Sequence, residues 1–223
     1  MAAKTKTAVP ATETRRLTES DCAAFGQLMA RTFDDGASYR AIFHTGNLQY
    51  FFSCRLFVVL RTGGLALGAF AKDGDALLAA GCASPPGADP SLWLQLRAGI
   101  LWLPYLYGWS SLGRLTQAAA ADKSALDRWH IQMVGVSETL RGGGMGSALM
   151  RQLFAETADG TPEAAAALAA VGAAGAAAGI AGFDVTTQTE GGRRFYERLG
   201  FKLTAEETHP MWGRDFHLAR GRE

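Results

Sequence analysis

The chain has 223 residues, of which 48% are hydrophobic, so it can bury the core of one large domain and is not a disordered chain. A formal net charge of +1 gives no electrostatic basis for binding nucleic acid or an acidic membrane. Three widely spaced cysteines exclude a disulfide framework and a zinc site. We therefore expect a cytoplasmic protein that has buried thiols and holds no metal.

The first elements of the chain are expected to be helices that follow one short strand. Thr18–Asp21 supplies the side chains that cap helices, and apolar residues after it recur three and four apart. Gly46 then interrupts the helical spacing. In chain order, the pattern predicts a flexible tail, a strand and two helical regions, over residues 1–12, 13–17, 22–33 and 38–60.

A hairpin and an aromatic-rich segment come next. Two apolar runs, 63–71 and 75–84, are joined by Lys72-Asp73-Gly74, and Asp-Gly between apolar runs is a strong hairpin signal. Residues 92–109 are the most apolar stretch, but polar residues and a proline interrupt it, so we do not expect it to span a membrane. A helix is expected over 112–121.

The remainder of the chain alternates strands and helices. Strands are predicted over 127–136, 183–188, 201–204 and 211–218, and helices over 144–157 and 191–199. The segment 162–182 consists mostly of alanine and glycine and is interpreted as a fraying helix or loop without chemistry. The alternation predicts an α/β fold around one mixed sheet, in a single domain over 13–223.

A glycine-dense turn, Arg141–Gly146, lies between a predicted strand and a predicted helix. The first N–H groups of a helix lack intrahelical partners, and glycine lets the backbone approach a bulky anion, so such a turn can bind phosphate. The turn is not a dinucleotide fingerprint, because Ser147 stands where the third glycine is needed. It is not a P-loop either, because no lysine follows it.

Two motifs resemble the signatures of the GNAT acyltransferases. Arg141-x-x-Gly144-x-Gly146 has the R/Q-x-x-G-x-G/A spacing of the acyl-CoA-binding motif of that family. About 50 residues later, Arg194–Phe201 resembles its second signature, a helix that carries Y-x-x-L-G-F into a final pair of strands. The resemblance covers residues 126–218. It implies a GNAT-like fold with a mixed, mostly antiparallel central sheet, flanked by helices and splayed between its fourth and fifth strands.

The resemblance also implies that acetyl-CoA is the co-substrate. The strand edge over 134–136 would pair with the pantetheine arm, the amides of the turn would hold the pyrophosphate, and the amide of Val136 would polarise the thioester carbonyl. For Arg141, a surface salt bridge is the alternative. The expected CoA-binding residues are Val134, Gly135, Val136, Arg141, Gly142, Gly143, Gly144, Met145, Gly146 and Ser147.

Direct attack of an amine on acetyl-CoA needs a base for the amine and an acid for the leaving thiolate. Tyr196 matches the position where the family carries that acid. Glu190, just past a strand end, is the predicted base; Glu138, His130 and a water chain are alternatives. Strict alternation would place His130 on the same face as Gln132 and Val134. The stretch before Tyr196 lacks the cofactor-binding Asn of the family, and Gln188 or Thr187 is expected to substitute.

The acceptor pocket is less defined by the sequence. Five aromatic residues could line it, or could pack in the core or at a dimer interface: Trp93, Trp102, Tyr105, Tyr107 and Trp109. Asp34 and Asp35 could attract an amine or shape a turn. The predicted function is N-acetyl transfer to a small-molecule or protein amine, with a homodimer left open. The alternative is an inactive GNAT-fold module that binds CoA or a protein.

Overall fold

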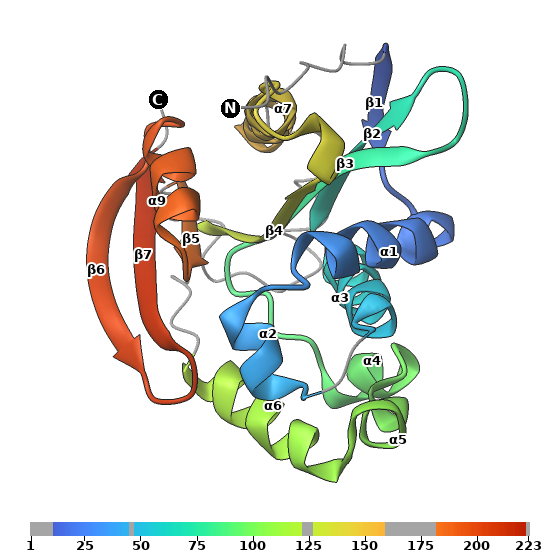
Figure 1. Cartoon of the computed structure of the whole chain (residues 1–223), viewed down its shortest axis with the longest axis vertical. Helices are drawn as coiled ribbons and strands as arrows, with labels where there is room; N and C mark the ends of the chain where they lie inside the picture. The colour runs from blue at the N-terminus through green and yellow to red at the C-terminus, as the bar shows by residue number, and fades with distance from the viewer. Residues whose placement is uncertain (1–10, 45–46, 122–126, 159–181, 222–223) are drawn as a thin grey trace, which may run out of the picture.

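The computed structural model describes residues 11–44, 47–121, 127–158 and 182–221 (Figure 1). Seven strands form one sheet in the order β1-β2-β3-β4-β5-β7-β6. Neighbouring strands are antiparallel except for β4 and β5, which are parallel. The expected mixed, mostly antiparallel sheet is confirmed.

The strands lie close to where the sequence places them. They are β1 Thr12–Arg16, β2 Leu65–Ala71, β3 Leu77–Ser84, β4 Trp129–Val136, β5 Gly182–Thr187, β6 Lys202–His209 and β7 Gly213–Gly221. The β2–β3 hairpin is confirmed, with Leu65 opposite Ala83. The last two strands are longer than predicted, because the β6–β7 ladder continues to its turn, where His209 pairs with Gly213.

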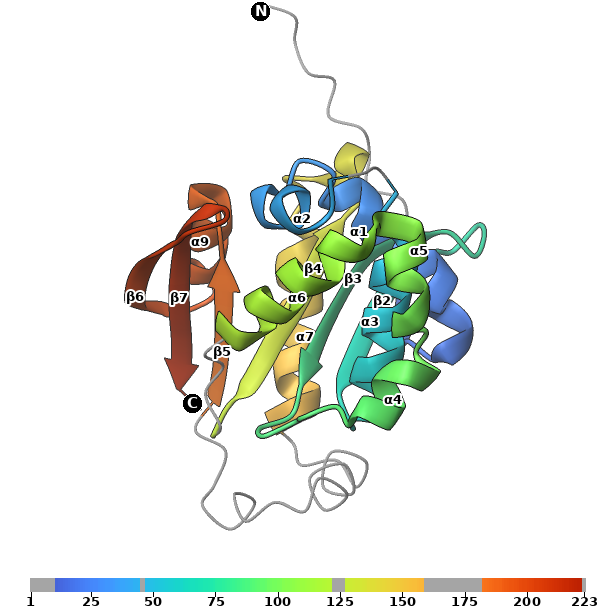
Figure 2. The same ribbon diagram turned by 90° about the horizontal axis from the view of Figure 1, so that it is seen from below.

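Helices cover both faces of the sheet (Figures 1 and 2). The α-helices are α1 Cys22–Thr32, α2 Ala37–Ile42, α3 Gln49–Arg61, α4 Leu92–Arg97, α5 Leu103–Tyr107, α6 Trp109–Ala121, α7 Met145–Ala158 and α9 Glu190–Glu197. Short 3-10 helices are η1 Glu19–Asp21, η2 Ile100–Trp102 and η3 Glu138–Leu140. Gly46 and most of the segment 162–182 lie outside the described residues, as do residues 1–10 of the expected tail.

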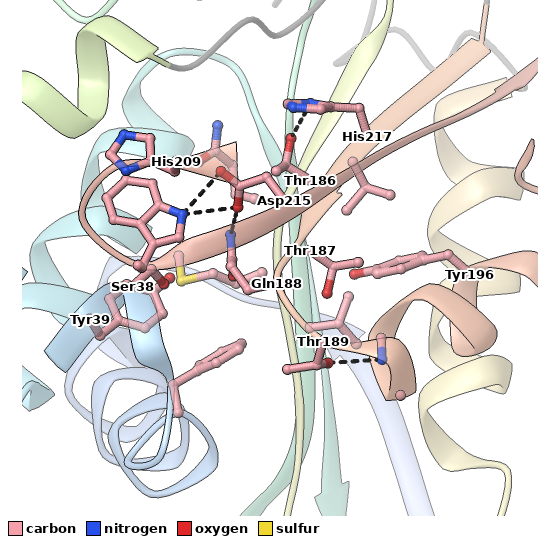
Figure 3. A pocket seen from close by; sticks show the side chains of 18 of the residues that line it. Ser38, Tyr39, Thr186, Thr187, Gln188, Thr189, Tyr196, His209, Asp215 and His217 are labelled. Atoms are coloured by element: carbon pink, nitrogen blue, oxygen red, sulfur yellow. Dashed lines mark hydrogen bonds between the residues drawn. The ribbon is translucent and has the colours of Figure 1, made fainter. Parts of the chain in front are cut away.

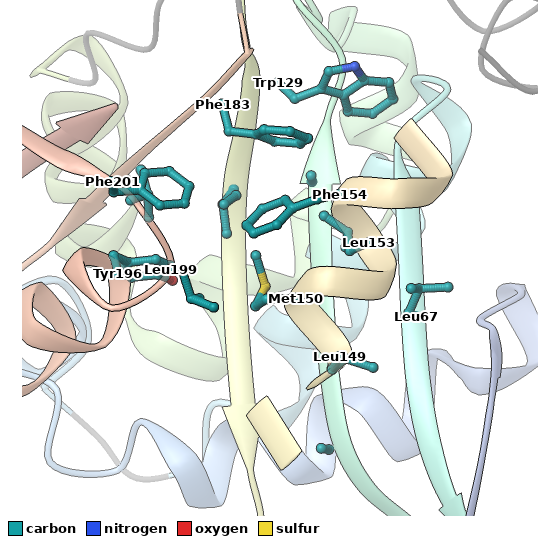
Figure 4. Close-up of a cluster of buried hydrophobic side chains, with 14 of the residues drawn as sticks. Leu67, Trp129, Leu149, Met150, Leu153, Phe154, Phe183, Tyr196, Leu199 and Phe201 are labelled. Carbon is teal, nitrogen blue, oxygen red and sulfur yellow. The ribbon is translucent and has the colours of Figure 1, made fainter. Parts of the chain in front are cut away.

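Two hydrophobic cores fill the space between the sheet and the helices. On one face, a single cluster extends from Leu67 of β2 past Leu153 of α7 to Tyr196 of α9 (Figure 4). On the other face, Ala66 of β2 packs with Phe25 of α1 and residues of α3. Adjacent residues of β2 therefore enter different cores, as the two-residue period of a strand requires. We refer to these as the α7–α9 face and the α1–α3 face.

A β-bulge in β4 changes which side chains face the site. Cys82 of β3 pairs with Met133 whereas Ala83 pairs with Ile131, so Gln132 is the extra residue. Ile131, before the bulge, lies in the α7–α9 core, and Val134, after it, packs against the same core, although two residues separate them. The expectation that His130, Gln132 and Val134 share a face is therefore wrong, because strict alternation fails across a bulge.

The aromatic segment 92–109 forms neither a strand nor a single helix. Trp93, Trp102, Tyr105 and Trp109 are 73%, 61%, 82% and 81% exposed, whereas Tyr107 is buried and donates to the carbonyl of Asn47. Of the five aromatic residues, only Tyr107 packs in the core. Exposed Trp and Tyr side chains are common at protein interfaces, so the dimer interface stays a prediction. Within the described ranges, no helix is long and apolar enough to cross a membrane.

An ion pair joins β1 to the turn before α1. Arg15 donates to both carboxylate oxygens of Asp21 at 2.7 and 2.9 Å, and the Thr18 backbone N–H donates to the same carboxylate at 2.8 Å. Mainly through the Arg15 hydrogen bond, the pKa of Asp21 falls from its usual 3.8 to about 2. The pKa of Asp21 is lower in the folded chain than in the unfolded chain. The charged carboxylate therefore stabilises the fold above pH 4, and this contribution is lost as pH falls toward 2.

Asp21→Asn is expected to lower the free energy of unfolding at pH 7 by about 1–2 kcal/mol, a range discounted for the half-exposed Arg15. Urea denaturation should show this loss at pH 7 and a much smaller one at pH 2.5. Asp35→Asn is the control, because Asp35 pairs with Arg40 at 2.9 Å but is almost fully exposed. Equal losses in both variants, or a loss independent of pH, would contradict the prediction.

Candidate active site

A cavity of about 940 Å³ opens where β4 and β5 separate (Figure 3). The two strands pair only from Trp129 opposite Phe183 to Ile131 opposite Val185. Beyond that point β4 runs on to Val136 and β5 to Thr187 without pairing with each other. The predicted splay between the fourth and fifth strands is therefore confirmed, and it forms the centre of the cavity.

The cavity reaches both faces of the sheet. Tyr196 lines it from the α7–α9 face, where its ring packs against Phe201 at 5.5 Å between centroids. Asp215 lines it from the other face, because the next residue of β7, Phe216, is buried in the α7–α9 core. Two molecules could thus approach the gap from opposite sides of the sheet.

The glycine turn lies at the α7–α9 end of the cavity. Gly142 and Gly144 both have φ of +83°, a conformation that favours glycine. The first α7 hydrogen bond runs from the Ala148 N–H to the Gly144 carbonyl at 3.0 Å, so the amides of residues 145–147 precede it. Gly146 and Arg141 line the cavity. The expected anion-binding amides therefore lie beside the splayed strands.

Of the predicted CoA-binding residues on β4, two line the cavity and one packs against a helix. Val134 and Val136 line the cavity, whereas a Cβ on Gly135 would lie 2.7 Å from the sulfur of Met29 in α1. Glycine at position 135 thus lets α1 pack closely on β4. Arg141 is exposed, and its Nε donates to the Val136 carbonyl at 3.3 Å. The guanidinium is therefore tied to the end of β4, next to the turn.

Tyr196 is buried, and its hydroxyl points toward Thr187 in Figure 3. Burial raises the pKa of the phenol well above its usual value of 10. Among the residues that the structure describes, none forms a hydrogen bond with this hydroxyl. The side chain is thus a protonated donor at neutral pH that faces the cavity.

The two predicted glutamates lie outside the cavity. Glu190 is exposed at the start of α9 and pairs with Arg214 at 3.5 Å. Glu138 is exposed in η3. Neither side chain lines the cavity, although Thr189 and Gly191, the neighbours of Glu190, do. A carboxylate at position 190 would reach a bound amine only through water.

His130 lines the cavity at the point where β4 and β5 stop pairing. Its Nδ1 lies 2.9 Å from a carboxylate oxygen of Asp184, its partner across the parallel pair. The two side chains are 12% and 15% exposed. A neutral imidazole that donates from Nδ1 to Asp184 leaves Nε2 free to accept a proton.

A polar cluster on β5 and the β6–β7 hairpin was not anticipated from the sequence, although one of its members, Gln188, was expected to contact CoA. Asp215 accepts from Trp212 Nε1 and Gln188 Nε2, each at 3.0 Å, and His217 Nδ1 lies 3.1 Å from Thr186 Oγ1. All five residues line the cavity. For Asp215 and His217, the only signal is their alternation with Phe and Leu over residues 215–218, which predicts a strand with one polar face.

The remaining acceptor candidates do not line the cavity. None of the five aromatic residues of the segment 92–109 does so, and neither do Asp34 and Asp35. Asp35 instead pairs with Arg40, as a turn residue would. Tyr39 of α2 and Gln117 of α6 line the cavity instead, so helices α2 and α6 form part of the cavity wall.

Comparison with known proteins shows which domain part of the chain resembles. A family model described as the acetyltransferase (GNAT) domain matches residues 110–203. No curated protein matches the sequence.

Solved acetyltransferase structures share the fold of almost the whole chain. One described as histone acetyltransferase HPA2 and related acetyltransferase from Corynebacterium glutamicum has 16% identity and a TM-score of 0.65, covering 95% of this chain and 97% of its own. A GNAT superfamily phosphinothricin acetyltransferase from Sinorhizobium meliloti, in complex with AcCoA, has 13% identity, a TM-score of 0.57 and coverages of 94% and 88%. For an aminoglycoside 6'-N-acetyltransferase complexed with coenzyme A, these values are 12%, 0.53, 94% and 96%.

The matched residues contain both the glycine turn and Tyr196. Residues 110–203 therefore match the GNAT acetyltransferase domain, and the fold of the whole chain is similar to that of solved acetyltransferases.

Proposed function

We propose that this protein transfers an acetyl group from acetyl-CoA to a primary amine by direct attack of the amine on the thioester. The observation that carries the proposal is the cavity in the splay, which joins the glycine turn on one face to a polar pocket on the other. The pyrophosphate of CoA binds the amides at the start of α7. The pantetheine arm pairs with the β4 edge near Val134 and Val136, and the thioester lies in the gap.

Tyr196 is the proposed acid. As the amine nitrogen bonds to the acyl carbon, the carbonyl gains negative charge, which the amide of Val136 stabilises. The carbon–sulfur bond then breaks, and the phenol protonates the departing thiolate. Burial favours this role because it raises the pKa of Tyr196 and keeps the proton on the phenol at neutral pH.

His130 is our proposed base, with Asp184 as the positioning residue. Its imidazole lines the cavity and is oriented by a carboxylate, the arrangement that aligns a histidine for proton transfer. Glu190 remains the alternative predicted from the sequence. It requires a water between its carboxylate and the amine, since Glu190 is exposed and paired with Arg214.

His130→Asn is expected to lower kcat/KM for the amine at least about tenfold at pH 7, because the asparagine amide can still donate to Asp184 but cannot accept the amine proton. The activity should recover as pH rises and the amine deprotonates in solution. Initial rates of thiol release across pH 6–10 test this. A ratio of variant to wild-type kcat/KM that does not change with pH would show that His130 is not the base. A larger loss of kcat/KM in Glu190→Gln than in His130→Asn would show the same.

The whole proposal is tested by calorimetric titration with acetyl-CoA, followed by detection of free CoA thiol on incubation with a panel of primary amines. Binding together with amine-dependent thiol release supports the transferase. Binding without release from any amine would favour the inactive GNAT-fold module, and absence of binding at high micromolar acetyl-CoA would exclude both.

A further inference from the structure

We propose that two copies of this chain associate through an aromatic patch on α4, η2, α5 and the start of α6. Among the residues that the structure describes, seven of the eight exposed large hydrophobic side chains belong to this patch, and the eighth is Leu203 on β6. The inference concerns assembly and does not rest on the proposed acyl transfer. The members of the patch are 44–82% exposed and comprise Leu92, Trp93, Leu101, Trp102, Tyr105, Leu106 and Trp109.

Helix α5 has apolar residues on both its buried and its exposed side. Leu103, Pro104 and Tyr107 are buried, whereas Tyr105 and Leu106 are exposed. A helix at the surface of a soluble domain normally presents charged and polar residues to water, and a helix that is apolar all round is normally covered. The five residues of α5, Leu-Pro-Tyr-Leu-Tyr, include no charged one. We therefore expect its exposed side to be covered in the assembled protein.

The members of the patch lie on elements that adjoin one another. Both α4 and α5 contact η2, and α5 contacts α6. In both views of the fold, α4 and α5 lie side by side and α6 starts next to α5 (Figures 1 and 2). The rings of Trp102 and Tyr105 meet edge to face, with centroids 6.3 Å apart. The exposed residues thus form one surface and are not scattered singly over the molecule, as exposed apolar residues of a monomer usually are.

The area of the patch is close to what a stable dimer needs. An aromatic side chain buries about 150–250 Å², so the four rings, which are 61–82% exposed, leave about 450–750 Å² in water in each copy, before the leucines are counted. The largest apolar patch of a typical monomer is about 300–600 Å². A stable interface takes about 800 Å² from each partner, and the patch can supply most of one side of it.

The charges in this part of the chain favour a protein partner over a lipid surface. Residues 90–121 contain no aspartate, glutamate or lysine, and their two basic residues are Arg97 and Arg114. Arg114 donates to the Ile42 carbonyl at 2.8 Å, whereas Arg97 is exposed. A helix that lies on a membrane carries many lysines and arginines on its polar face. Protein interfaces are instead rich in aromatic residues and arginine and poor in lysine and carboxylates, as this segment is.

The apolar character of the patch favours a second copy over a different protein. Interfaces with transient partners are about as polar as the remaining surface, whereas homodimer interfaces are more apolar. An apolar patch is also complementary to itself, so a two-fold axis can place the same residues on both sides. A second copy is always present in equal amount, and it can therefore cover the patch permanently.

The test is the mass of the full-length protein in solution. Light scattering after size-exclusion chromatography is expected to give twice the chain mass of 23.7 kDa for wild type at micromolar concentration. Trp102→Glu and Tyr105→Glu should each raise the dimer dissociation constant at least about thirtyfold, the scale on which a central Trp or Tyr contributes to an interface. Sedimentation equilibrium measures this constant. Leu203→Glu is the matched control, because it places the same charge at an exposed leucine outside the patch, and its constant should equal that of wild type.

A measurement on wild type makes the test independent of whether a variant folds. The amides of residues 92–109 should exchange hydrogen more slowly at protein concentrations above the dissociation constant than below it. A monomeric wild type, or exchange over 92–109 that does not depend on concentration, would overturn the inference. Dissociation by Leu203→Glu but not by Trp102→Glu would overturn it in favour of an interface at β6. A monomeric wild type that sediments with phosphatidylserine vesicles would overturn it in favour of a membrane contact.

Discussion

Tyr196→Phe is expected to lower kcat for acetyl transfer at least about tenfold while the affinity for acetyl-CoA stays unchanged. The substitution removes only the hydroxyl that we propose as the proton donor to the leaving thiolate, and general acids contribute on this scale or more. The ring still packs against Phe195 and Phe201, so the fold is retained. Steady-state kinetics with calorimetric binding of acetyl-CoA measures both quantities.

Tyr107→Phe is the control for this experiment. Tyr107 is also a buried tyrosine, but its hydroxyl donates to the Asn47 carbonyl and does not line the cavity. Loss of this hydroxyl should change thermal stability and leave kcat as it was.

Because burial raises the pKa of Tyr196 above 10, the wild-type rate should also not decrease with rising pH below pH 10. Unchanged turnover in Tyr196→Phe would remove this residue from the acid role.

Gly144→Glu is expected to weaken acetyl-CoA binding at least about thirtyfold. A side chain at φ of +83° strains the turn, and its carboxylate competes with the pyrophosphate for the free amides of α7. Together these effects are expected to cost about 2 kcal/mol or more, and every 1.4 kcal/mol is a factor of ten in affinity. Calorimetric titration with acetyl-CoA gives the dissociation constant directly.

Gly87→Glu isolates the effect of position. Gly87 also has a positive φ, of +67°, and a Cβ there would likewise meet nothing within 4 Å, but it lies in the loop after β3 and not before the start of α7. Both variants add the same charge and similar backbone strain. Similar affinities in the two variants would show that the glycine turn does not hold the cofactor.

The sequence predicts the residues proposed to bind CoA better than those proposed to face the acceptor. The turn and Tyr196 belong to contiguous motifs, and local glycine and helix chemistry determines where they lie. Asp215 and Glu207 become neighbours only through strand register, and His130 faces the cavity only because of how β4 and β5 pair. Such contacts are not encoded by spacing along the chain.

One expectation failed, and one alternative was excluded, for identifiable physical reasons. The bulge at Gln132 adds a residue to β4 without any proline or glycine to mark it, so the faces beyond it exchange. For the aromatic residues of the segment 92–109, a pocket wall was one alternative beside core packing and a dimer interface. Here the segment breaks into short helices at Gly99 and Gly108, both with positive φ, and the breaks leave most of its rings outside.

A passage that crosses the sheet has a kinetic consequence. In the proposed reaction CoA and the acceptor reach the gap from opposite faces, so neither would have to leave before the other arrives, and both would be present when the bond forms. CoA would likewise depart without displacing the acylated product. The splay between β4 and β5 would thus provide separate entrances for donor and acceptor, which suits a ternary complex better than a covalent acyl-enzyme intermediate.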